Sequence, residues 1–123
     1  MTDGSAKTRI LIAEDNALVL MSLEALAEDM GWDVVGPAMT LTEAVALARD
    51  SEADLALLDV NLNGERSVPV AEILKQRGVP VIFATGYGDD IGLPDSLAGT
   101  PVVSKPFSLD ALEAMLRAHA PTG

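Results

Sequence analysis

Short apolar runs alternate with amphipathic stretches along the chain, and the alternation repeats five times. Each run is too short for a stable helix, whereas the apolar residues of each intervening stretch recur three or four positions apart, as on one face of a helix. The runs predict strands at residues 9–13, 32–35, 54–58, 79–83 and 102–103. The stretches between them predict helices through residues 19–30, 40–50 and 70–77, and a last helix after residue 108.

Cap signals place two of the helix starts. Thr40 with Glu43 three residues later has the form of a capping box. Ser108 is a suitable N-cap for the last helix, whose inward face is expected to carry Leu109, Leu112, Met115 and Leu116. Residues 86–100 contain four glycines and a proline, so the helix between the fourth and fifth strands is expected to be short or absent.

Continuously apolar strands with helices between them indicate an α/β fold, a parallel sheet covered on both faces. Right-handed crossovers place the carboxyl ends of all five strands at one edge of this sheet. Ligands of such open sheets bind outside that edge. A functional site is therefore expected there.

Composition narrows the class of protein. The 123 residues predict one domain, with a core over about residues 8–119. A net charge of −11 argues against binding to nucleic acid or to an anionic membrane. There is no cysteine, no apolar run near the roughly 20 residues of a membrane span, and no readable secretion signal, so a cytoplasmic protein is expected.

Polar residues follow four of the five apolar runs. Glu14 and Asp15 follow the first, Asp59 the third, Thr85 the fourth and Lys105 the fifth. Three carboxylates this close repel each other, and one lysine cannot balance them. A hard divalent cation with oxygen ligands resolves the imbalance, and Mg²⁺ suits a site with few carboxylates.

The same residues suit phosphoryl transfer. The ionised carboxylate of Asp59 can attack a phosphoryl group whose charge is neutralised by the cation and Lys105. The hydroxyl of Thr85 can donate to a phosphoryl oxygen. The pattern therefore predicts an aspartyl-phosphate site.

From about residue 8 to residue 119 the sequence resembles the receiver domain of bacterial response regulators, the CheY-like family. This resemblance implies a flavodoxin-like (βα)5 fold with strand order 2-1-3-4-5. It implies that Asp59 is the phosphoacceptor, and that Asp15 binds Mg²⁺ directly and Glu14 through water. Asn61 corresponds to the position whose backbone carbonyl completes the metal shell. Thr85 and Lys105 correspond to the switch hydroxyl and the family's lysine, with a Lys105–Pro106 bond that is typically cis.

The run Phe83-Ala-Thr-Gly-Tyr-Gly88 resembles the subfamily named for its Phe-Ala-Thr-Gly signature, which histidine kinases of the HWE and related types often serve. Val102 stands three residues before the lysine, where many receivers carry an aromatic residue. The partners implied are a histidine kinase or a histidine phosphotransfer protein, together with a downstream protein that the sequence does not identify.

Two other functions fit parts of the pattern. Haloacid-dehalogenase-like phosphatases also form an aspartyl phosphate, but they require a second carboxylate two residues after the nucleophile, where this chain has Asn61. A pseudo-receiver or a phosphate sink keeps the fold without the same output. A signalling module rather than an enzyme is expected.

Overall fold

The computed structural model describes residues 7–86 and 92–121. One parallel sheet has the strand order β2-β1-β3-β6-β7, which in chain order is the expected 2-1-3-4-5. The doubly wound α/β fold is thereby confirmed. Its strands are β1 (Arg9–Ala13), β2 (Asp33–Ala38), β3 (Leu55–Asp59), β6 (Val81–Thr85) and β7 (Val102–Ser104).

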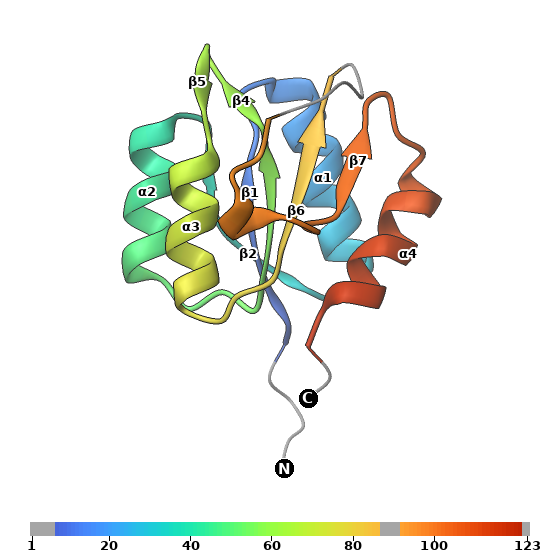
Figure 1. Cartoon of the computed structure of the whole chain (residues 1–123). Helices are drawn as coiled ribbons and strands as arrows, with labels where there is room; N and C mark the ends of the chain where they lie inside the picture. The colour runs from blue at the N-terminus through green and yellow to red at the C-terminus, as the bar shows by residue number, and fades with distance from the viewer. Residues whose placement is uncertain (1–6, 87–91, 122–123) are drawn as a thin grey trace.

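Two helices cover each face of the sheet (Figure 1). On one face lie α1 (Ala17–Asp29) and α4 (Leu109–His119), and on the other lie α2 (Leu41–Asp50) and α3 (Val68–Gln76). No helix in the described part of the chain is both long enough and apolar enough to cross a bilayer.

The core consists of two apolar layers, one on each face of the sheet. Side chains of a strand point alternately to opposite faces. Ile10 and Ile12 accordingly pack in the layer beneath α1 and α4, and Leu11 and Ala13 pack in the layer beneath α2 and α3. Burial on both faces explains why the strands are continuously apolar rather than alternating.

The caps form largely as predicted. The hydroxyl of Ser108 accepts the N–H of Ala111 at 3.0 Å, and that of Thr40 accepts the N–H of Glu43 at 3.2 Å. The carboxylate of Glu43 accepts the N–H of Met39 at 2.9 Å, one residue before the position that a regular capping box uses.

The last helix departs from prediction at one position. Leu112 and Leu116 are buried, but Leu109 is 43% exposed. It occupies the first turn of α4 and is not part of the apolar layer beneath α1 and α4.

A small hairpin after β3 was not predicted. Its strands are β4 (Asn61–Leu62) and β5 (Glu65–Arg66), joined by Asn63 and Gly64, both with positive φ (54° and 87°). Two consecutive positive φ values define a type I′ turn, which Asn-Gly favours.

Between β6 and β7, residues 92–100 contain a single 3-10 turn, η1 (Asp95–Leu97). This part of the segment agrees with the expectation that the helix between the fourth and fifth strands is short or absent. Tyr87 and Gly88, which complete the Phe-Ala-Thr-Gly-Tyr-Gly run, lie outside the described residues.

Candidate metal and phosphoacceptor site

Three carboxylates meet at the carboxyl edge of the sheet. Glu14 and Asp15 follow β1 directly and Asp59 ends the neighbouring strand β3. One oxygen atom from each of the three lies within 4.8 Å of the other two. The parallel pairing of these two strands thus brings together residues that are about 45 positions apart.

The two acidic residues after β1 are held differently. Glu14 is only 1% exposed, and its Oε2 atom accepts the N–H of Asn16 at 3.0 Å. Asp15 is half-buried, and its Oδ2 atom accepts the N–H of Asn63 at 2.8 Å. The tip of the β4–β5 hairpin is therefore tied to the acidic cluster.

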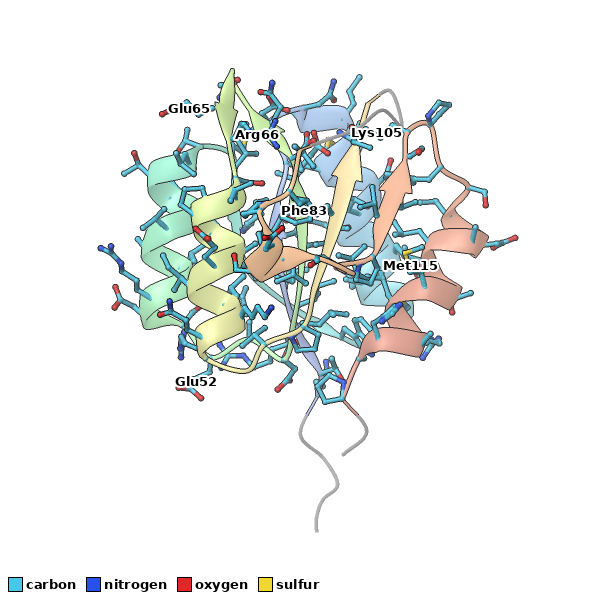
Figure 2. The ribbon with its side chains drawn as sticks, viewed as in Figure 1. Glu52, Glu65, Arg66, Phe83, Lys105 and Met115 are labelled. Carbon is cyan, nitrogen blue, oxygen red and sulfur yellow. The ribbon has the colours of Figure 1, made fainter. Side chains whose placement is uncertain are left out.

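Lys105 bridges two of the carboxylates. Its Nζ atom lies 2.7 Å from Glu14 Oε1 and 3.0 Å from Asp59 Oδ2. Its backbone N–H donates to the carbonyl of Thr85 at 2.8 Å, and the Lys105–Pro106 bond is cis, as the resemblance implied. In Figure 2, Lys105 lies at the same end of the molecule as the hairpin residues Glu65 and Arg66.

Burial dominates the electrostatics of Asp59. Loss of hydration raises the pKa of its carboxyl from 3.8 to about 6; the hydrogen bond from Lys105 lowers it in part, and the charge of Glu14 raises it further. Burial alone would lower the pKa of Lys105, but its hydrogen bonds to Glu14 and Asp59 outweigh that effect and raise the pKa overall. Lys105 therefore compensates the negative charge of an ionised Asp59 only in part.

The two remaining predicted residues flank the carboxylates. Thr85 is buried at the end of β6, the strand beside Asp59. Asn61 begins β4, and its side-chain oxygen accepts the N–H of Gly64 at 2.7 Å. The side chain of Asn61 is thus engaged within the hairpin.

Sequence reasoning missed two residues at this site. Asn63 contacts Asp15 through its backbone, and Ser67 donates its hydroxyl to the backbone carbonyl of Asp59 at 2.6 Å. The Asn-Gly pair was a usable hairpin signal. Nothing in the sequence distinguishes Ser67 from an ordinary helix cap.

The donor set fits a hard cation. It consists of carboxylate oxygens, the ligands that Mg²⁺ prefers. The three oxygens lie within 4.8 Å of one another, so a single cation can be shared by all three side chains.

An apolar surface adjoins the site. A cavity of about 380 Å³ lies between α1 and the loop after β7, and Lys105 is part of its lining together with Val19 and Phe107. Beside it, Leu18 and Met21 on α1 are 77% and 64% exposed.

A doubly wound sheet with an acidic cluster and a lysine at its carboxyl edge defines the class of CheY-like α/β domains. The family model for the response regulator receiver domain matches residues 10–117. The chain belongs to this family of two-component signalling domains, as the sequence analysis expected.

Two curated bacterial regulators are similar to this chain in sequence. The chain is 38% identical over 112 residues to the phyllosphere-induced regulator PhyR of Methylorubrum extorquens, covering 89% of this chain and 42% of PhyR. It is 32% identical over 113 residues to the transcriptional regulatory protein PdtaR of Mycobacterium tuberculosis, covering 89% of this chain and 55% of PdtaR. The chain spans about half the length of these curated relatives.

Among solved structures, SdrG from Sphingomonas melonis Fr1 is 43% identical, with a TM-score of 0.77 over 93% of this chain and 97% of SdrG. A structure titled the BeF3-activated conformation of SdrG matches over the same shares of both chains, with a TM-score of 0.73.

Proposed function

We propose that residues 8–119 form a receiver whose Asp59 accepts a phosphoryl group, in a reaction that depends on Mg²⁺, from a histidine kinase or a histidine phosphotransfer protein. The phosphorylated domain signals by contacting a downstream protein. The observation that carries this proposal is the environment of Asp59, a buried carboxylate with two acidic neighbours and with the Nζ atom of Lys105 at 3.0 Å.

Asp15, Asp59 and the backbone carbonyl of Asn61 would hold the metal, with Glu14 acting through water. When bound, Mg²⁺ neutralises phosphoryl oxygens and the carboxylates that surround them. Oxygen-only donors and the hydrogen bonds that already fix Glu14 and Asp15 support this assignment.

In the transfer step, a carboxylate oxygen of Asp59 forms a bond to phosphorus as the bond from phosphorus to the donor's imidazole nitrogen breaks. The bonding electron pair leaves with the imidazole. Lys105 exchanges its contact with the Asp59 carboxylate for a phosphoryl oxygen, and the Thr85 hydroxyl donates to another. The backbone N–H of Lys105 donates to the carbonyl of Thr85, so the two residues are held next to each other at this edge of the sheet.

A protein donor is favoured over a small molecule by the surface next to the site. The exposed Leu109 lines a cavity that Lys105 also lines, and the exposed Leu18 and Met21 lie on α1, which contributes Val19 and Ser22 to the same cavity. A partner that covers these apolar side chains brings its phosphohistidine to Asp59. The Phe83-Ala-Thr-Gly86 run and the likeness to PhyR and SdrG support membership of the Phe-Ala-Thr-Gly subfamily and a kinase of the HWE type.

A phosphatase of the haloacid-dehalogenase type is disfavoured. Asn61 stands where such an enzyme needs an acid and base, and its side chain is engaged with Gly64. We therefore propose a signalling role without turnover of a small substrate. Sustained hydrolysis of para-nitrophenyl phosphate by the purified protein would favour the enzyme.

Incubation with acetyl phosphate and Mg²⁺ tests the proposal, with intact-protein mass as the readout. The parent is expected to gain one phosphoryl group, whereas Asp59→Asn and a sample treated with a chelator gain none. Asp33→Asn is the matched control, because this exposed carboxylate lies at the other end of the strands; it should behave like the parent. Absence of phosphorylation in the parent would instead indicate a pseudo-receiver.

A further inference from the structure

Ser67 is buried in a way that sets it apart from the other serines. Four polar or charged side chains are buried in the described part of the chain, and three of them, Glu14, Asp59 and Thr85, belong to the candidate site. The fourth is Ser67, with 0% exposure. A buried hydroxyl requires a hydrogen-bond partner, and the partner of Ser67 is part of the same site.

Ser67 holds two consecutive carbonyl groups of the chain that leaves Asp59. Its hydroxyl donates to the carbonyl of Asp59 at 2.6 Å, and its backbone N–H donates to the carbonyl of Val60 at 2.9 Å. On the opposite side, the N–H of Val60 donates to the carbonyl of Ala84 in β6 at 2.9 Å. The segment between Asp59 and Asn61 is therefore fixed from both sides.

The hydroxyl of Ser67 does not serve the helix that it precedes. Ser67 is the N-cap residue of α3, yet its side chain makes no cap hydrogen bond, although serine at this position usually accepts one from the first turn. Ser108, the N-cap of α4, does make that bond, to Ala111. The hydroxyl of Ser67 is thus used for Asp59 in place of its ordinary structural role.

We infer that Ser67 is a positioning residue, which orients the Asp59 carboxylate and the Asn61 backbone carbonyl by holding the peptide units between them. This inference rests on the proposed function, because it concerns the same metal and phosphoacceptor groups. The carboxylate of Asp59 and the carbonyl of Asn61 must point to one ion together. A loosened backbone between them weakens both interactions.

Ser67→Ala tests the inference, with Ser108→Ala as the matched control for the loss of a serine at a helix N-cap. The Kd for Mg²⁺ is measured by calorimetry at a temperature where melting curves show each variant to be folded. We expect Ser67→Ala to raise this Kd about tenfold, the usual scale for a group that orients a metal ligand. We expect its rate of phosphorylation by acetyl phosphate at saturating Mg²⁺ to fall by about tenfold, while Ser108→Ala stays within about twofold of the parent in both measurements.

A spectroscopic readout separates positioning from general loss of stability. In the parent, Mg²⁺ should shift the 13C resonance of the Asn61 backbone carbonyl, and Ser67→Ala should reduce that shift at saturating metal. Ser108→Ala should leave the shift unchanged. Equal losses of this shift in the two serine variants would show that the effect comes from lower stability alone, and would overturn the inference.

Parental Mg²⁺ affinity and phosphorylation rate in folded Ser67→Ala would also overturn it. Should Ser67→Ala fail to fold, Ser67→Cys replaces it, because the thiol is close to the hydroxyl in size but is only a weak donor. In this variant, a Mg²⁺ affinity weakened by about threefold or more supports positioning, and a parental affinity refutes it. A parent that neither binds Mg²⁺ nor accepts phosphate would show instead that the proposed function has failed.

Discussion

Asp59→Asn should stabilise the metal-free protein, because it removes a charge that the folded domain accommodates poorly. The pKa of Asp59 is raised from 3.8 to about 6, first by burial and then by the charge of Glu14, against the opposing hydrogen bond from Lys105. The difference is about two units, which corresponds to about 3 kcal/mol at about 1.4 kcal/mol per unit. The amide resembles the uncharged acid in shape, and Lys105 keeps its partner Glu14 at 2.7 Å.

The sign of the pH dependence follows from the raised pKa. Below pH 3.8 the carboxyl is protonated in both the folded and the unfolded state, so it costs nothing. As the pH rises toward about 6, the unfolded state ionises first and the parent loses stability relative to Asp59→Asn. Above that pH the full difference of about 3 kcal/mol is reached, equivalent to roughly 10 °C in melting temperature for a domain of this size.

Urea denaturation in the presence of a chelator, at several pH values from about 4 to about 8, measures this difference. Asp33→Asn serves as the control, because its parent carboxylate is 59% exposed and its replacement should stay within about 0.5 kcal/mol of the parent. An Asp59→Asn variant that is less stable than the parent at neutral pH would show that the ionised Asp59 carboxylate does not destabilise the fold. A gain that does not change with pH would refute its electrostatic cause.

Asp15→Ala is expected to weaken Mg²⁺ binding strongly in calorimetric titration, while Lys105→Ala spares or tightens it, because Lys105 competes for Glu14 and Asp59; equal affinities in parent and Asp15→Ala would contradict the ligand assignment. Gly64→Ala should cost about 1 kcal/mol in urea denaturation, since it places a side chain at φ 87° with open space around it; an unchanged stability would argue against the type I′ turn. Amides of residues 92–100 should exchange with deuterium faster than those of β6 in the metal-free protein and gain protection with beryllofluoride and Mg²⁺. Identical exchange in both states would exclude that segment as the switching element.

The sheet and the approach of the three carboxylates could be predicted because both follow from short-range patterns combined with general topology. Five apolar runs fix the strands, and the parallel arrangement places Glu14, Asp15 and Asp59 at one edge whatever the details of packing. In most strands the predicted and the observed ends differ by one or two residues. For example, β6 starts two residues later than the apolar run suggested.

Features that depend on three-dimensional contact could not be predicted. Helical spacing placed Leu109 on the inward face of the last helix, but it is exposed in the first turn of α4. Lys105 was expected to neutralise a phosphoryl group, and its direct contacts with the carboxylates of Glu14 and Asp59 were not foreseen. The use of the Ser67 hydroxyl depends on the path of the chain after Asp59, and a sequence pattern carries no information about that path.

Chemical trapping of the phosphorylated residue identifies the phosphoacceptor itself. An aspartyl phosphate is an acyl phosphate, which borohydride reduces so that the aspartate becomes homoserine, and peptide mass spectrometry then locates the changed residue. After treatment with acetyl phosphate and Mg²⁺, we expect homoserine at position 59 and at no other acidic position, and none when Mg²⁺ is removed by a chelator. Homoserine at a different aspartate, or full phosphorylation without a divalent cation, would contradict this expectation.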